Sequence, residues 1–185
     1  MLAIFQKLSG GILAIEKIVM IFLAAAVTGL ILLNVVTRSV DYALYWVDEL
    51  AIYSMIWMVM IGASMIVRLR KGIAVTILEE MLSQRMKNHV ALLVDFVILA
   101  FALILIWMCF LWYDPLALIS VNFDLAEFSA DSFNFIYEEP TNTLGIPKFW
   151  IWLIVPTVAV TMTIHAAVNF FERLLRRPTT APEII

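Results

Sequence analysis

Long apolar stretches separated by short polar ones set the pattern of this chain. Four of them, at residues 18–36, 50–67, 90–113 and 149–171, contain a single carboxylate, Asp95, and no lysine or arginine. An α-helix rises about 1.5 Å per residue, so each stretch is long enough to cross a hydrocarbon layer of about 30 Å. The pattern therefore predicts an all-α membrane protein with four transmembrane helices, folded as a single domain over residues 1–177.

The remaining segments have a different periodicity. Residues 1–17 predict a short interfacial helix before the first span, and residues 178–185 predict a disordered tail. Pro156 lies inside the fourth span and predicts a local kink. Between the second and third spans, Gly72–Lys87 predicts an amphipathic helix in the membrane interface, because apolar residues recur there at helical spacing, namely Ile73, Ile77, Leu78, Met81 and Leu82.

The distribution of lysine and arginine fixes an expected orientation. Cytoplasmic flanks of membrane proteins are enriched in these residues. If the amino terminus is cytoplasmic, only Arg38 and Lys148 lie outside. The cytoplasmic set is then Lys7, Lys17, Arg68, Arg70, Lys71, Arg85, Lys87, Arg173, Arg176 and Arg177. We therefore expect both termini in the cytoplasm.

Composition excludes several classes of protein. The 185 residues are 64% hydrophobic and 15% charged, which in a soluble domain would leave too much apolar surface in water. Cys109 is the only cysteine, so a disulfide framework, a CxxC redox pair and a thiolate zinc site are excluded. Two histidines, His89 and His165, are too few and too far apart for haem or a metal cluster. We expect no cofactor, no metal, no catalytic residue and no nucleic-acid partner.

Asp95 and His165 are the candidate residues for intramembrane chemistry. Both lie about one and a half helical turns inside the same edge of the membrane, and an ionisable residue at such depth indicates a proton or ion relay by default. The simpler alternative is a buried polar pair, in which Asp95 bonds to His165, Lys17 or a nearby arginine and fixes helix packing. A carrier builds its site at mid-bilayer from broken, repeated helices, whereas the middle of each span here is apolar. A stand-alone carrier or channel using Asp95 and His165 therefore stays as the alternative function, and a membrane redox enzyme is disfavoured.

Several short motifs occur in a fixed order along the chain. Trp46-Val-Asp-Glu49 opens the second span, Gly62-Ala63 lies late in it, and Arg68 begins a basic turn. Leu144-Gly-Ile-Pro147 and Trp150 precede the fourth span, which contains Pro156 and His165. In this order and spacing, from about Ala24 to Leu174, the chain resembles the small membrane subunit of tripartite ATP-independent periplasmic (TRAP) transporters.

This resemblance implies a function and a set of partners. The chain would be an accessory scaffold in the bacterial inner membrane, bound to a large multi-helix membrane subunit that carries the sodium and substrate sites. A periplasmic binding protein would deliver an organic acid, such as sialic acid or a dicarboxylate. Deep tryptophans and ten methionines agree with a broad packing surface for another membrane protein. We expect the partner interface to include Trp46, Glu49, Trp57, Gly62, Arg68, Ile77, Leu78, Met81 and Leu82.

Overall fold

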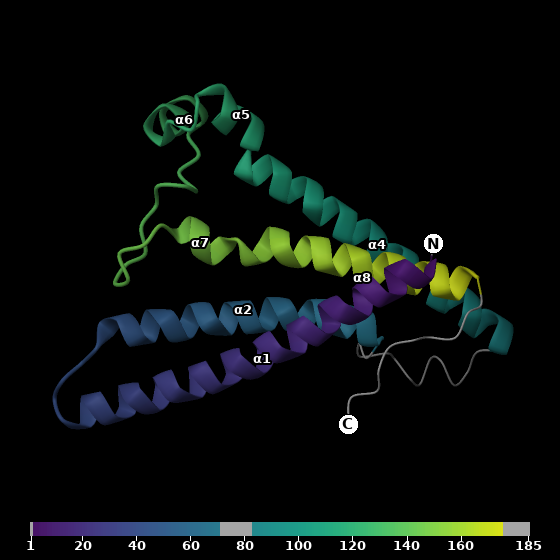
Figure 1. The fold of residues 1–185 in the computed structure, drawn as a ribbon, viewed down its shortest axis with the longest axis horizontal. Helices are drawn as coiled ribbons and strands as arrows, with labels where there is room; N and C mark the ends of the chain where they lie inside the picture. Colours follow the sequence, from purple (N-terminus) through teal and green to yellow (C-terminus); the bar gives the residue numbers. More distant parts are fainter. Residues whose placement is uncertain (1, 71–82, 176–185) are drawn as a thin grey trace.

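The fold was obtained as a computed structural model, which describes residues 2–70 and 83–175 (Figure 1). Regular structure in these residues is helical apart from one isolated bridge between Pro140 and Pro147. Four helical segments are long and apolar enough to cross a membrane, which confirms the predicted all-α class and its four spans. The helices are α1 (Leu2–Ser39), α2 (Tyr45–Leu69), α4 (Gln84–Tyr113), α5 (Pro115–Ser120), α6 (Leu125–Ser132), α7 (Lys148–Trp152) and α8 (Ile154–Leu174).

Helix α1 is longer than the sequence pattern indicates. It runs without interruption over 38 residues, so the segment predicted as a separate interfacial helix is continuous with the first span. No proline lies between Leu2 and Ser39, and Gly10 and Gly11 weaken a helix without ending it. At about 1.5 Å per residue α1 is roughly 57 Å long, nearly twice the hydrocarbon thickness of about 30 Å.

The other predicted boundaries fall close to the observed ones. The fourth span is divided at Leu153 into α7 and α8, in the turn before Pro156. Proline has no N–H to offer the carbonyl four residues earlier and its ring crowds that carbonyl, which accounts for the interruption. Most of the predicted amphipathic segment Gly72–Lys87 and all of the predicted tail lie outside the described residues. Gln84–Lys87 form the first turn of α4, which Ser83 caps by accepting from the Met86 N–H.

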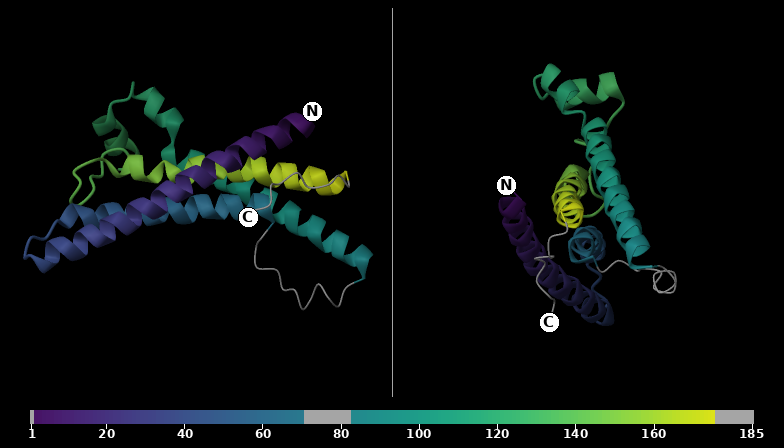
Figure 2. Two further views of the ribbon diagram at one scale, coloured as in Figure 1. Left: turned by 60° about the horizontal axis from the view of Figure 1, so that its bottom comes forward. Right: turned by 90° about the vertical axis from the view of Figure 1, so that its right-hand side faces the viewer.

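Helix α8 is the central element of the bundle. It contacts each of the other three long helices, and a larger share of its residues is buried than in α1, α2 or α4 (Figure 2). The hydrophobic core gathers one residue each from α1, α2 and α4 around three from α8, namely Leu23, Ile61, Ala102, Ile154, Val158 and Met162. The bundle is thus held at mid-depth by apolar contacts.

Helix α2 runs parallel to the span formed by α7 and α8, and polar contacts join the two along their length. The indole Nε1 of Trp57 donates to the Ile151 carbonyl at 2.8 Å. The hydroxyls of Ser64 and Thr161 lie 2.9 Å apart, and Arg68 reaches Asn169. Sequence separation between these partners rises only from 94 to 101, as parallel helices require. The remaining faces of the four helices are largely apolar and exposed, which suits contact with lipid or another membrane protein.

Candidate functional site

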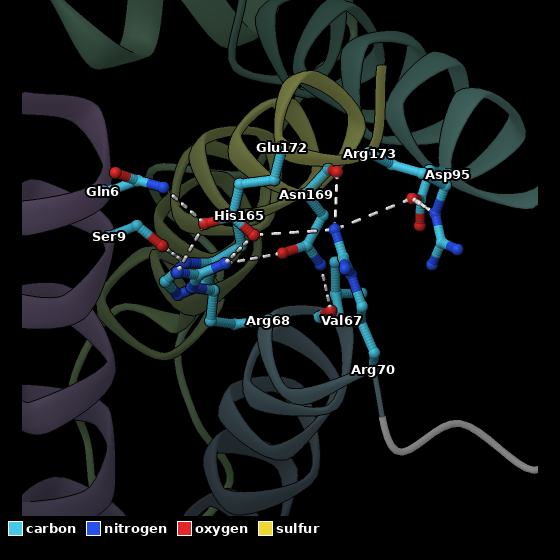
Figure 3. A network of polar contacts seen from close by, with 10 residues as sticks. All are labelled: Gln6, Ser9, Val67, Arg68, Arg70, Asp95, His165, Asn169, Glu172 and Arg173. Carbon is cyan, nitrogen blue, oxygen red and sulfur yellow. Dashed lines mark hydrogen bonds and ion pairs between the residues drawn. The ribbon is translucent and has the colours of Figure 1, made fainter. Parts of the chain in front are cut away.

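Polar side chains gather at one end of the bundle, where α1 begins and where α2 and α8 finish. We call this the charged end. All four long helices contribute to it (Figure 3). The residues drawn together are Gln6, Ser9, Val67, Arg68, Arg70, Asp95, His165, Asn169, Glu172 and Arg173.

Arg68 and Glu172 form the centre of the charged end. Both side chains have 0% exposure, and two Arg68 nitrogens each lie 3.3 Å from a Glu172 oxygen. Arg68 also donates to the Asn169 side-chain oxygen at 2.7 Å, and the Asn169 amide donates to the Val67 carbonyl at 2.6 Å. Gln6 of α1 donates to Glu172 at 3.1 Å. A buried ion pair with these additional hydrogen bonds joins α1, α2 and α8.

Asp95 connects α4 to the same network. Its carboxylate accepts from Nε of Arg173 at 2.5 Å, and Arg70 lies 3.9 Å away. Arg70 also donates to the Asn169 carbonyl and lies 3.6 Å from Glu172. Burial lowers the pKa of Arg70 from its ordinary value, while the neighbouring Asp95 carboxylate acts in the opposite direction. Asp95 is thus held by two arginines.

His165 is the second intramembrane candidate, and it has different partners. Its Nδ1 lies 2.7 Å from the Ser9 hydroxyl and its Nε2 lies 3.2 Å from a Glu16 oxygen. His165 and Ser9 are fully buried, and Glu16 is nearly so. These contacts join α8 to α1. Asp95 and His165 therefore belong to one cluster without bonding to each other in the described contacts.

Each carboxylate of this cluster has a basic side chain beside it. Asp95 lies within ion-pair distance of Arg70 and Arg173. Glu172 lies within that distance of Arg68 and Arg70. Glu16 contacts the His165 ring. Within residues 2–70 and 83–175, no group of three histidine, cysteine or acidic side chains is placed to hold a metal ion. Chemically, the arrangement can fix four helices relative to one another, which is a positioning role.

A second polar contact lies at the opposite end of the bundle, which we call the loop end. The carboxylate of Glu49, near the start of α2, accepts from three consecutive backbone N–H groups, those of Asn142, Thr143 and Leu144, at 2.8, 2.6 and 3.0 Å. The Thr143 and Tyr53 hydroxyls also donate to it. Hydrogen bonds to an ionised carboxylate are stronger than those between neutral groups. Glu49 therefore holds the loop before α7 against α2.

The backbone conformation of the loop at 141–147 places these N–H donors around the Glu49 carboxylate. Gly145 has φ +69°, a left-handed conformation that glycine adopts without the steric cost of a side chain. The turn is closed by the Thr141 N–H, which donates to the Ile146 carbonyl at 2.8 Å, and Pro147 then precedes the first turn of α7. Two motifs far apart in sequence, Trp46–Glu49 and Leu144–Pro147, therefore meet in space.

The residues expected to bind a partner divide into four groups. Glu49, Trp57 and Arg68 direct their polar groups at partners within the chain. A Cβ at Gly62 would lie 3.3 Å from Met20, so this glycine allows close packing of α2 on α1. Trp46 is 40% exposed. Ile77, Leu78, Met81 and Leu82 lie outside the described residues.

Sequence reasoning missed most of the charged end. Gln6, Ser9, Glu16, Asn169 and Glu172 were not candidates, because each lies in the predicted interfacial segment or near the edge of a span and resembles an ordinary flanking residue. One signal was available. His165, Asn169 and Glu172 are spaced four and then three residues apart, which places them on one face of a helix whose other residues there are mainly apolar.

A search of curated proteins gives no match. The model of one protein family matches residues 27–176, and that family is described as "Tripartite ATP-independent periplasmic transporters, DctQ component". Its members are transporter components and not enzymes, and the family implies a large membrane subunit and a periplasmic binding protein as partners. Because the match covers most of the 185 residues, this multi-pass membrane protein belongs to the DctQ component family of TRAP transporters.

Proposed function

We propose that this chain is the static scaffold of a sodium-coupled transporter that takes up organic acids, such as sialic acid or dicarboxylates, across a bacterial inner membrane. The observation that carries this proposal is the position of the buried ionisable groups. The interactions of Arg68, Asp95, His165 and Glu172 gather at one end of the bundle, whereas the core at mid-depth is apolar. A carrier needs the reverse arrangement, with polar groups at the midplane.

The charged end suits a part that must keep its shape while a partner moves. Removing one member of a buried ion pair leaves the other charge unpaired, at a cost of about 3–5 kcal/mol. Sliding α1 or α4 along α8 would break the contacts of Glu16 or Asp95 in the same way. The network therefore opposes relative movement of all four helices.

The proposed orientation places the charged end in the cytoplasm and the loop end in the periplasm. It is supported by the lysine and arginine distribution, with Arg68, Arg70 and Arg173 at the charged end. At the loop end, Arg38 and Lys148 are each engaged by a carboxylate, Asp48 and Glu139 respectively. Single cysteines at Asp131 and Gln84, both exposed, test this in a Cys109→Ala background. An impermeant thiol reagent added outside should label only the cysteine at 131.

We further propose that the partner subunit contacts exposed Trp46 and the apolar residues Ile77, Leu78, Met81 and Leu82. Glu49, Trp57, Gly62 and Arg68 support that surface indirectly, through the internal contacts described above. The Leu78→Ala/Leu82→Ala double variant should lower co-purification of the large subunit while insertion of this chain is unchanged. Full recovery of the large subunit together with full transport would place the interface elsewhere.

Reconstitution tests the function as a whole. The chain alone in liposomes should give no sodium-driven uptake of any organic acid, whereas the assembled three-component system should transport. In the assembled system, Asp95→Asn should act on stability and assembly, leaving the sodium dependence of the remaining uptake unchanged. Robust uptake by the chain alone that Asp95→Asn abolishes would establish the alternative, a stand-alone carrier using Asp95 and His165.

A further inference from the structure

Two phenylalanines flank helix α6 in left-handed backbone conformations that bulky residues rarely adopt. Phe123 precedes the helix with φ +64°, and Phe133 follows it with φ +55°. Bulky residues are disfavoured in this left-handed region, and the residue that follows a helix in this conformation is most often glycine. Burial of the ring does not offset the cost of this backbone conformation at either position, since Phe123 is 65% exposed and Phe133 is 82% exposed. Both rings are therefore left uncovered by the rest of the chain.

The segment that carries them is well defined. Asp114 accepts from the Ala117 N–H at the start of α5, and Asp124 accepts from the Glu127 N–H at the start of α6. Phe128, in the middle of α6, is 1% exposed and its ring packs edge-on against Tyr137. The segment is also tied back to α4, because the Asn134 amide donates to the Trp112 carbonyl at 2.7 Å. α5 and α6 thus hold the two exposed rings in fixed positions.

We propose that α5 and α6 rest on the bilayer at the loop end, with Phe123 and Phe133 inserted at the boundary between headgroups and hydrocarbon. This assignment depends on the membrane location of the chain, and it holds for either orientation and any transported substrate.

The exposed apolar residues that lead from α4 to α5 indicate that lipid covers the two rings. The exposed apolar face of α4, which includes Met108 and Leu111, continues through Leu116 and Ile119 of α5 to Phe123. In Figures 1 and 2, α5 and α6 lie on the α4 side of the bundle, away from α1 and α2. Exposed apolar side chains thus recur along the chain from α4 through α5 to Phe123, and Phe133 follows at the other end of α6.

The depth of the segment is marked by aromatic residues. Trp112 packs against Trp152, and Tyr113 packs against Tyr137 and Phe149, so an aromatic layer lies where α4 meets α5. Tryptophan and tyrosine concentrate at the membrane–water interface. Glu127 and Asp131 lie four residues apart on α6 and are exposed, so they share one face that can remain in water while the flanking phenylalanines enter the membrane.

Depth-dependent quenching tests this proposal. The full chain, carrying Cys109→Ala and one cysteine at Phe123, Phe133 or Asp131, is labelled with the fluorophore NBD and placed in phosphatidylcholine nanodiscs. Labels at 123 and 133 should emit further to the blue and be quenched at least twofold more by shallow doxyl lipid than the label at 131. Aqueous iodide should show the opposite order.

Two results would overturn it. Equal iodide quenching at 131 and 133 would show that the rings face water. Shielding of 123 and 133 that appears only after the large subunit is added would show that a protein, and not lipid, covers them. Failure of the scaffold proposal is distinguishable, since it shows as lost co-purification and leaves these lipid signals unchanged.

Discussion

The two ends of the bundle fix distant parts of the chain by different chemistry. At the charged end, Arg68, Glu172, Asp95 and His165 pair side chain with side chain across four helices. At the loop end, one side chain, Glu49, binds consecutive backbone N–H groups of a loop. The first arrangement depends on the identity of every partner, whereas the second depends on one carboxylate and the shape of the backbone. Substitutions should therefore act differently at the two ends.

The largest effect is expected at the charged end. Arg68→Ala leaves the Glu172 carboxylate buried beside a cavity, and we expect a loss of about 3–5 kcal/mol in the free energy of unfolding. Arg38→Ala is the matched control, because it removes the arginine of the exposed pair with Asp48, where a loss of about 0–1 kcal/mol is expected. Unfolding in mixed micelles compares the two variants. Equal losses would mean that burial of the Arg68 pair has no energetic consequence.

Glu49→Gln measures the loop end. The amide keeps the size of the side chain and one acceptor oxygen, but it loses the charge that strengthens the bonds from Asn142, Thr143 and Leu144. We expect a loss of about 2–3 kcal/mol and faster proteolysis of the loop at 140–147. Thr143→Val removes only the hydroxyl donor and should cost about 1 kcal/mol. If Glu49→Gln lowers the free energy of unfolding no more than Thr143→Val does, the negative charge of Glu49 does not strengthen these hydrogen bonds.

A glycine pair isolates the contribution of backbone shape. A Cβ added at Gly145 or at Gly29 would meet no other atom within 4 Å, so neither substitution creates a clash between residues. They differ in conformation, because Gly145 has φ +69° whereas Gly29 lies inside α1. Gly145→Ala should destabilise by about 1–2 kcal/mol, and Gly29→Ala should be neutral or stabilise by up to about 1 kcal/mol. A neutral Gly145→Ala would show that the loop can supply donors to Glu49 in another conformation.

Some parts of this fold could be predicted from the sequence and others could not. The four spans and the break near Pro156 follow from local pattern, since hydropathy and proline act within a few residues. The extension of α1 to Leu2 was missed, because residues 2–17 mix charges with apolar positions and their polar face is buried against α8.

Motif residues could be found in the sequence, but their roles could not be assigned. Glu49 and Arg68 stood out in the pattern and were expected to face a partner, whereas the structure directs both inward. Their partners Thr143 and Glu172 lie 94 and 104 residues away, and no local rule links positions at that distance. His165 and Asp95 were found by their depth, yet which groups they bond depends on helix order and rotation, which hydropathy does not specify.

The smallest effect is expected for Phe133→Gly at the loop end, and Phe128→Ala, at a buried ring of the same segment, is the contrasting control. Phe128→Ala removes a ring that is 1% exposed, and we expect a loss of about 3–5 kcal/mol from the lost contacts and the cavity. Phe133→Gly removes the steric cost of a left-handed φ of +55°, which should raise the free energy of unfolding by about 1–2 kcal/mol. Glycine also makes the unfolded chain more flexible, which should lower it by about 0.4–1 kcal/mol. The net result should be a gain of about 0–1.6 kcal/mol in the detergent-solubilised chain. If Phe133→Gly instead destabilises as much as Phe128→Ala, the ring at 133 supports the fold itself, and its exposure must be explained by contacts within the chain.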